Sequence, residues 1–207
     1  MNLPGLTPQG ESSRRVFVGI KEGQLVVRDP ETNADVFFRD ITGRLLKIDN
    51  HKASFADNAE IEFFDLVMIN EGVTYVLSIR KDSSASRQII NCLSSVKDFA
   101  NNVIIAPWKT RETADKKSYV NVSVYEGVRD DSHKLKWAVE QLPKLKVVTV
   151  GRKEFYDNSE LLDALEKMVG EINARIPSGE KLQAVRPQDV AASRVNNSAK
   201  EDDDLPF

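Results

Sequence analysis

Alternating apolar and polar positions run through most of the chain and predict a mainly β protein. Two short apolar runs flank Lys21, Glu22 and Gly23, and this pattern indicates a β-hairpin with a glycine turn. Gly43 interrupts a longer run and marks a bulge or a sharp bend inside one strand. The predicted strands are residues 16–20, 24–28, 35–49, 61–70, 73–81, 103–109 and 118–126, with one or two more between 135 and 150.

Apolar residues recur at helical spacing in two segments. The first is residues 83–99, where we expect one helix. The second begins at Asp157, whose carboxylate suits an N-cap with Glu160 as its capping-box partner, and it ends before Pro177. The apolar stripe of this second helix packs either on the domain or on a second subunit. The stripe consists of Leu161, Leu162, Leu165, Met168, Val169, Ile172 and Ile176.

The order strand, strand, strand, helix, strand, strand is typical of a five-stranded Greek-key barrel of the OB-fold type. We therefore predict a mainly β (α+β) fold: an OB-fold-like barrel with an extra N-terminal hairpin, one inserted helix and a C-terminal helix. From residue 178 onward aromatic residues are absent until the last position, which is typical of a disordered segment. The predicted organisation is a flexible N-terminus at 1–15, the OB-like domain at 16–177, a disordered linker at 178–200 and an acidic tip at 201–207.

Charge is unevenly distributed along the chain of 207 residues. There are 29 basic and 32 acidic residues, which gives a net charge of −3. From Pro187 onward there are two basic and five acidic residues, and subtracting these from 29 and 32 leaves 27 of each sign in the body. This asymmetry indicates an acidic interaction tail attached to a neutral body that has a separate partner.

Composition also excludes several classes of protein. A single cysteine cannot form an intramolecular disulfide, and no Cys/His cluster has the spacing of zinc ligands. No apolar run is long enough to span a bilayer, and the N-terminus lacks the basic-then-apolar order of a secretory signal. We therefore expect a soluble cytoplasmic protein that does not bind membranes.

Candidate catalytic residues are few. His51 and His133 lie far apart in polar segments and are expected on the surface, while Cys92 lies on an apolar helix face as a small buried side chain. One carboxylate cluster has the composition of a two-metal nuclease site, but a solvated strand face explains it better. The cluster is Asp57, Glu60, Glu62 and Asp65. We predict a protein that is not an enzyme and that needs no metal or cofactor.

The strand at 118–126 has an outward face that is unusually rich in tyrosine. Val120, Val122 and Val124 alternate toward the core, so Tyr119 and Tyr125 point the other way. A plain solvent face would carry lysine, glutamate and threonine instead. These tyrosines either belong to a binding surface or cover a helix, and the sequence leaves both alternatives open.

Trp108 ends the strand at 103–109, and basic residues follow it directly. Aromatic rings beside lysine and arginine on a β-surface suit unpaired bases, because the rings stack on the bases and the cations follow the phosphates. Trp137, in contrast, is in phase with Leu135 and Val139 and is expected in the core. The candidate DNA-binding residues are Trp108, Tyr119, Tyr125, Arg80, Lys109, Arg111, Lys116 and Lys117.

The end of the chain is the most specific signal in the sequence. A terminal phenylalanine suits an apolar pocket, its carboxylate suits an arginine, and the aspartates before it suit a basic rim. Pro206 restricts the backbone, so that less entropy is lost when this segment binds. The residues predicted to bind a partner are Asp202, Asp203, Asp204, Leu205, Pro206 and Phe207.

This ending resembles the C-terminal tip of bacterial single-stranded DNA-binding proteins, an acidic run closed by an aliphatic residue, proline and phenylalanine. The body does not obviously resemble that family, and the chain looks like a divergent version encoded by a bacteriophage. The resemblance implies a non-catalytic protein that coats single-stranded DNA without strong sequence preference during replication, recombination and repair. Its location would be the bacterial cytoplasm, including that of a phage-infected host. Its tip would recruit replication and recombination proteins, and a homo-oligomer is compatible with this role.

Two alternatives belong to other functional classes. The first is a protein–protein adaptor or recombination mediator that uses the same tip without coating strands. The second is a nuclease that uses the carboxylate cluster. Binding of single strands separates the main prediction from the first alternative, and magnesium-dependent cleavage would support the second.

Overall fold

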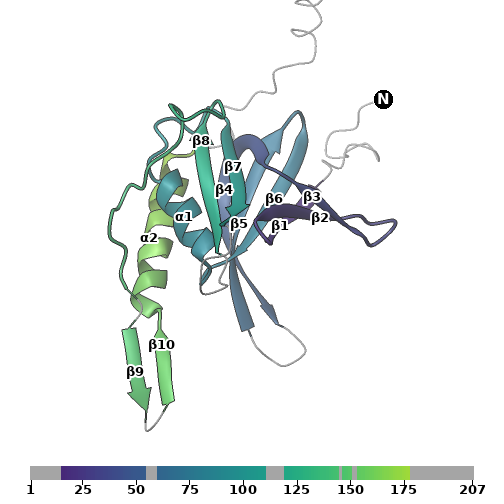
Figure 1. Cartoon of the computed structure of the whole chain (residues 1–207). Helices are drawn as coiled ribbons and strands as arrows, with labels where there is room; N and C mark the ends of the chain where they lie inside the picture. Colours follow the sequence, from purple (N-terminus) through teal and green to yellow (C-terminus); the bar gives the residue numbers. More distant parts are fainter. Residues whose placement is uncertain (1–14, 55–59, 111–118, 145, 151–152, 178–207) are drawn as a thin grey trace, which may run out of the picture. The chain divides into compact units, whose positions relative to one another are not determined.

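The computed structural model describes residues 15–54, 60–110, 119–144, 146–150 and 153–177 (Figure 1). The chain divides into two units, Met1–Pro177 and Ser178–Phe207. All of the described residues belong to the first unit. They form one large sheet, a small separate hairpin and two helices, so the described part of the chain is mainly β, as the alternation predicts.

The main sheet has eight strands, and two helices accompany it. Its strands are β1 (Arg15–Lys21), β2 (Gln24–Arg28), β3 (Asp35–Phe38), β4 (Ile41–Ser54), β5 (Glu60–Asn70), β6 (Val73–Arg80), β7 (Val103–Lys109) and β8 (Val120–Glu126). The separate hairpin consists of β9 (Lys146–Val150) and β10 (Lys153–Asp157). The helices are α1 (Ser84–Leu93) and α2 (Ser159–Arg175).

The order of strands in the main sheet is β3-β2-β1-β6-β5-β4-β7-β8. Neighbouring strands are antiparallel except for β1 and β6, which are parallel. The sheet curls, so the β1–β2 turn meets β7 although three strands separate β1 from β7 in the sheet. At that contact Gly23 has φ +78°, and a Cβ atom added to it would lie 2.6 Å from the backbone nitrogen of Lys109. Glycine is therefore required there both by the turn and by the close approach of the two backbones.

The core lies on the concave side of the sheet and is closed by the helices. Its largest fully buried side chains include Phe64, Leu66 and Leu77 from the central strands. The stripe of α2 contributes to this same core, so it packs on its own domain. Its buried members are Leu161, Leu165, Met168, Val169 and Ile172. Among the described residues, no helix is long and apolar enough to cross a membrane.

Two polar contacts attach α2 to the sheet. Strand β4 has an irregularity between Leu45 and Lys47, and beyond it the Asn173 side chain binds the Ile48 backbone. It accepts from the Ile48 N–H and donates to the Ile48 carbonyl, both at 2.8 Å. The buried ammonium of Lys81 lies 2.5 Å from a Glu166 carboxylate oxygen of α2.

The long strand predicted at 35–49 is divided at a different residue. The chain leaves the sheet at Arg39 and Asp40, between β3 and β4, and not at Gly43. Gly43 lies inside β4, where an added Cβ atom would be 2.9 Å from the carbonyl oxygen of Ile69. The glycine therefore permits a close approach of neighbouring strands, and it stands where β4 changes its pairing from β7, at 41–43, to β5, from Arg44 onward.

Both helices differ from prediction at one end. Helix α1 stops at Leu93, and the buried residues Val96 and Phe99 follow in irregular chain. Helix α2 begins at Ser159, with Asn158 as its N-cap. Asp157 lies one residue earlier, where its carboxylate accepts from the Ser159 N–H at 3.0 Å, and this bond lowers the pKa of that carboxyl.

The segment after β8 also departs from prediction. Residues 135–144 are irregular, and the strand in this region starts only at Lys146. Trp137 is 49% exposed, so its expected place in the core was wrong. Its phase relationship with Leu135 and Val139 assumed a regular strand that does not form there.

Candidate nucleic-acid interface

Trp108 and Tyr119 lie together where β7 and β8 approach their connecting loop. Trp108 is opposite Asn121 in the ladder, and the Tyr119 N–H donates to the Thr110 hydroxyl at 2.9 Å. The Thr110 N–H in turn donates to the Tyr119 carbonyl at 2.9 Å. Alternation then places both rings on one face of this strand pair, as diagonal neighbours about 7–8 Å apart at the backbone.

This face is open at the end that carries the two rings, whereas Ile104, Ala106 and Ser123 farther along it are buried. Val122 and Val124, which alternate to the other side, are buried, whereas Trp108 is 47% exposed and Tyr119 is 56% exposed. Lys109 is also exposed, but as the residue next to Trp108 it alternates to the opposite face of β7, near the β1–β2 turn. We call Trp108, Lys109, Thr110 and Tyr119 the Trp108–Tyr119 patch. It offers two stacking rings on one face and a cation at the same end of β7 on the other face.

The other predicted DNA-binding residues are not part of this patch as described. Tyr125 is only partly exposed and pairs across the ladder with Ile104, so it is not a second exposed ring beside Tyr119. Arg80 lies at the end of β6, and its guanidinium donates twice to the Asp82 carboxylate, at 3.0 and 2.7 Å. The remaining three, Arg111, Lys116 and Lys117, lie outside the described residues, as does the whole C-terminal tip.

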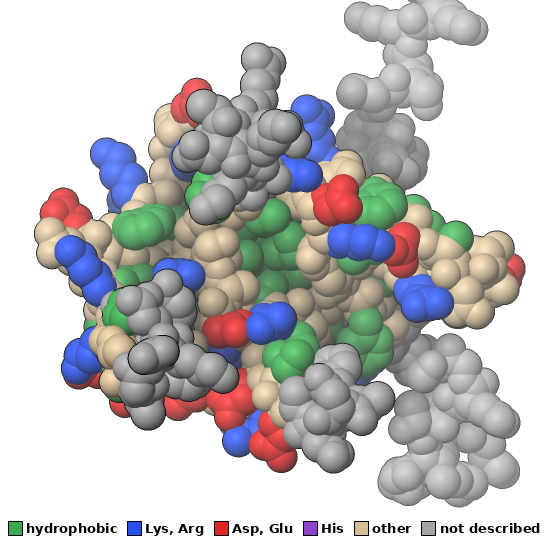
Figure 2. Space-filling model, turned by 60° about the horizontal axis from the view of Figure 1, so that its bottom comes forward, with side chains coloured by type: hydrophobic (Ala, Val, Ile, Leu, Met, Phe, Trp, Pro, Cys, Tyr) green, Lys and Arg blue, Asp and Glu red, His purple; other side chains and the backbone are tan. Residues whose placement is uncertain are grey.

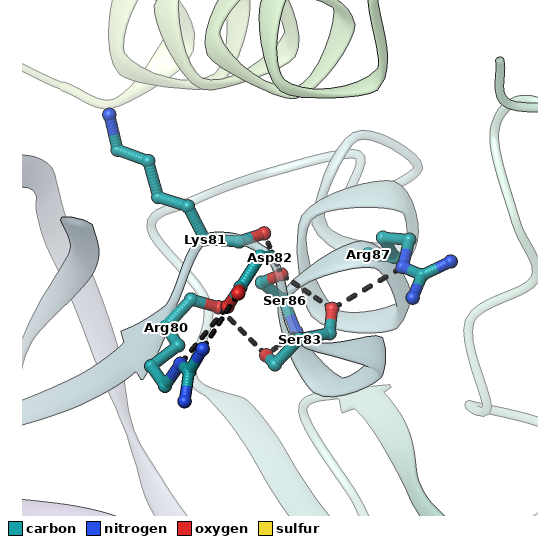
Figure 3. Close-up of polar contacts among 6 residues, drawn as sticks. All are labelled: Arg80, Lys81, Asp82, Ser83, Ser86 and Arg87. Carbon is teal, nitrogen blue, oxygen red and sulfur yellow. Dashed lines mark hydrogen bonds and ion pairs between the residues drawn. The ribbon is translucent and has the colours of Figure 1, made fainter. Parts of the chain in front are cut away.

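The neighbourhood of Arg80 is a helix cap (Figure 3). The Ser83 hydroxyl accepts from the Ser86 N–H at 3.1 Å, and the Ser86 hydroxyl donates to the Lys81 carbonyl at 2.6 Å. Figure 3 shows the Lys81 side chain extending toward another helix while Arg80 and Arg87 lie around the start of α1. These hydrogen bonds among neighbouring residues stabilise the first turn of α1.

Sequence reasoning missed an exposed aromatic surface on the N-terminal strands. Phe17 is 65% exposed and lies opposite Val76 of the parallel neighbour β6. Phe37 is 45% exposed and lies opposite Val26. Arg15 and Arg28 alternate onto the same side of their strands, which is opposite the buried side of Val18 and Leu25. We call Phe17, Phe37, Arg15 and Arg28 the Phe17 face.

A signal for the Phe17 face was present in the sequence. Val16, Val18 and Ile20 alternate toward the inside, which leaves Phe17 facing outward. Phe37 and Phe38 are consecutive, and two consecutive residues of a strand cannot share a face. Figure 2 shows one face of the molecule on which hydrophobic side chains lie at the centre, with both basic and acidic side chains around them.

An open pocket lies on the inner side of the N-terminal strands. It has a volume of about 490 Å³ and is lined mostly by apolar side chains, among them Val16, Val27, Phe38 and Tyr75. Its charged member, Asp40, forms an ion pair with Arg129. Such a mostly apolar lining suits an apolar group, such as a side chain of a protein partner.

The carboxylates considered for a nuclease do not converge. Glu62 and Asp65 lie on opposite faces of β5, since their positions differ by three and strand residues alternate between faces. Glu62 binds Lys52 at 2.7 Å and Lys81 at 3.2 Å, and hydrogen bonds from these two lysines lower the pKa of its carboxyl. Asp57 lies outside the described residues, and no group of three or more His, Cys, Asp or Glu within them is placed to hold a metal ion.

His51 is more constrained than a solvated loop residue. It lies within β4, and its ring stacks on Phe63 with centroids 4.9 Å apart and planes at 6°. Its Nδ1 is 2.7 Å from an Asp65 carboxylate oxygen. Asp65 also accepts from the Ser78 hydroxyl at 2.6 Å, so these groups form a structural network across three neighbouring strands.

The chain matches no protein-family model, no curated protein and no solved structure. Its function is therefore inferred from the Trp108–Tyr119 patch, the Phe17 face and the sequence of the tip.

Proposed function

We propose that this protein binds single-stranded DNA without strong sequence preference and recruits replication and recombination proteins through its C-terminal tip. One observation carries the proposal: Trp108 and Tyr119 are exposed together on one face of β7–β8. Stacking of a base on such a ring contributes about 1–3 kcal/mol and tolerates any base. Cations for the phosphates come from Lys109, at the same end of β7, and from Arg111, Lys116 and Lys117, which follow it in the sequence.

The strand order supports an OB-fold as the finer architecture. Strands β4, β5 and β6 follow one another as antiparallel neighbours, and after α1 the chain returns in β7 beside β4. The spatial order β7-β4-β5-β6 is that of a Greek key, and β8 extends it to five strands with a helix between the third and the fourth. In this interpretation β1, β2 and β3 are an addition beside β6.

OB-folds bind oligonucleotides on their second and third strands and on the loops between strands 1–2 and 4–5. Here these correspond to β5 and β6 and to the connections at 55–59 and 110–119. Trp108 and Tyr119 flank the second connection, and Phe17 lies beside Val76 of β6. Both exposed aromatic surfaces thus adjoin regions that this fold uses for nucleic acid.

The test is a fluorescence titration of the full chain carrying Trp137→Phe, so that Trp108 is the sole tryptophan. Oligo-dT is expected to quench this fluorescence in a salt-sensitive way, whereas duplex DNA of equal length is not. Anisotropy of a labelled oligo-dT gives the affinity independently. Absence of binding in both measurements would contradict the proposal.

A second candidate is a protein–protein adaptor or recombination mediator that uses the same tip without coating strands. The apolar pocket near Phe38 favours it, because that lining suits a protein side chain. The titration separates the two functions, since an adaptor of this kind leaves Trp108 fluorescence unchanged by oligo-dT.

A further inference from the structure

The two edges of the main sheet differ in how they are protected. At the β8 edge, the Val122 N–H donates to the Gln88 side chain at 2.9 Å and the Val120 carbonyl accepts from Ser84 at 3.2 Å. The Val124 carbonyl accepts from the Leu135 N–H at 2.8 Å. Helix α1 and the chain after β8 thus cover this edge, and Figure 1 shows α1 beside it.

The opposite edge is β3, and its side chains are fully open. All four of its residues are exposed, including Val36 at 41%, Phe37 at 45% and Phe38 at 47%. Within the described residues, no backbone hydrogen bond reaches β3 from any element other than β2. The strand has no proline, lysine or bulge, and its remaining protection against pairing is its short length and the Asp35 carboxylate.

The sequence of this edge is complementary to itself. Residues 35–39 read Asp-Val-Phe-Phe-Arg, with an acid at the start of β3 and a base at Arg39, the first residue after it. If two copies pair antiparallel about Phe37, Asp35 of each copy lies opposite Arg39 of the other. Val36 then lies opposite Phe38, and the two Phe37 rings meet at the twofold axis. Charge and apolar surface are both matched in this register.

We propose that β3 pairs with β3 of a second copy of this chain and joins the two main sheets into one dimeric sheet. The twofold axis runs perpendicular to the sheet at Phe37, because an antiparallel pair of identical strands has that symmetry. Side chains that share a face in one copy therefore share it with those of the other copy. The Phe17 face continues across the dimer as a result.

A charge-swap experiment tests the pairing. Asp35→Arg places two basic side chains opposite each other, and Arg39→Asp places two acidic ones opposite each other, so each variant alone turns two attractive pairs into repulsive ones. We expect sedimentation equilibrium to show a dimer of the 23.2 kDa wild-type chain whose dissociation constant rises about tenfold in either variant. An equimolar mixture of the two variants restores both attractive pairs and is expected to recover the wild-type dissociation constant as a heterodimer.

The mixture also guards against misfolding. Asp35 binds Lys21 at 2.7 Å within the chain, so Asp35→Arg disturbs a local contact as well. A variant that merely misfolds does not recover on mixing, and circular dichroism of each variant checks its fold directly. A monomeric wild-type chain, or a dimer that neither variant weakens, would overturn the proposal.

A disulfide trap gives a second, geometric test. Residues directly opposite each other across an antiparallel pair have Cα atoms about 4.5–5.5 Å apart, within the range of about 4.4–6.8 Å that a disulfide bridges. Phe37→Cys is therefore expected to form an intermolecular disulfide with oxidised glutathione, while native Cys92 is buried. Phe17→Cys is the control, since Phe17 is more exposed but lies two strands from the edge. Equal crosslinking of the two variants would exclude this register.

Discussion

Trp108 and Trp137 are exposed to nearly the same degree, 47% and 49%, but their surroundings differ. Trp108 lies on a regular strand whose ladder places Tyr119 diagonally across from it. Trp137 lies in an irregular segment, where the Val139 N–H and carbonyl are bound by the Asn91 side chain at 2.9 and 2.8 Å. Exposure alone therefore does not distinguish the two tryptophans, whereas the neighbouring Tyr119 ring does.

This pair of tryptophans gives a matched prediction. Trp108→Ala is expected to weaken oligo-dT binding by about 5- to 150-fold, because it removes a stacking interaction of about 1–3 kcal/mol. Trp137→Ala removes an equally exposed ring outside the patch and is expected to leave the affinity unchanged. Anisotropy titrations of both variants at one salt concentration measure the difference. Equal losses in the two variants would contradict a specific role for Trp108.

Cys92 lies in the kind of environment that its sequence pattern predicts. Its spacing on a helix face predicts a small buried side chain, and it is 4% exposed. Burial raises the pKa of its thiol to about 11, an effect that Lys134 partly offsets. The thiol therefore stays protonated at neutral pH, and its described role is packing in the core.

At the level of elements, the curl of the sheet depends on a contact between distant parts of the sequence. Gly23 in the β1–β2 turn approaches the backbone of Trp108 and Lys109 so closely that an added Cβ atom would lie within 2.8 Å of three atoms. Gly72, in the β5–β6 turn, has nearly the same φ of +80°, and nothing lies within 4 Å of its Cβ position. Gly72 therefore carries only the conformational demand of positive φ, whereas Gly23 carries that demand and the close approach of β7 as well.

Substitution of each glycine by alanine tests that contact. Gly72→Ala is expected to lower the free energy of unfolding by about 1 kcal/mol, because alanine is strained at positive φ. Gly23→Ala carries the same strain and also forces apart β2 and β7, so we expect a further loss of about 1–3 kcal/mol. Urea unfolding followed by circular dichroism measures both values. Equal losses would mean that the curl does not depend on this approach.

Local sequence patterns predict where the strands of this fold lie better than they predict which strands pair. Strand β7 occupies the predicted residues Val103–Lys109, and the hairpin around Gly23 forms as expected, because both depend on alternation and turn chemistry within a few residues. The parallel pairing of β1 with β6 has no such signal, since a long stretch of chain separates Phe17 from Val76. Helical spacing predicts a helix as far as Phe99. In the structure α1 ends at Leu93, and the buried residues after it reach the core from irregular chain.

For the candidate site as well, the sequence predicts local features better than contacts between distant parts of the chain. Alternation predicts an outward Tyr119, and the basic residues that follow Trp108 predict that it is exposed; both side chains are exposed. The Phe17 face was missed because its residues come from three separate strands, although each strand indicates its own outward ring. Tyr125 has the same alternation as Tyr119, yet it is partly covered near the bridge that Tyr125 forms with Lys134. That bridge is a contact with later chain that local periodicity does not encode.

At the scale of the whole molecule, the body of the chain and its last residues differ in net charge. The body has equal numbers of basic and acidic residues, and the excess negative charge lies in the last residues. A neutral body does not attract nucleic acid by its overall field, so attraction must come from a local group of cations. The sequence places four such residues, Lys109, Arg111, Lys116 and Lys117, between or beside Trp108 and Tyr119.

The salt dependence of binding measures how many of these cations meet phosphates. For single strands the logarithm of the association constant falls with the logarithm of salt concentration by about 0.7 for each phosphate neutralised. Four contacts therefore predict a slope of about −3 for the wild-type chain, and Lys109→Ala is expected to reduce its steepness by about 0.7.

Trp108→Ala is the control for this measurement, because loss of stacking lowers affinity at every salt concentration and leaves the slope unchanged. A wild-type slope near zero would mean that the four cations do not meet phosphates, whatever Trp108 contributes. An unchanged slope in Lys109→Ala, with the wild-type slope near −3, would instead assign the phosphates to the loop cations and leave Lys109 to its contact with the β1–β2 turn. The two variants together thus separate base stacking from phosphate neutralisation within a single patch.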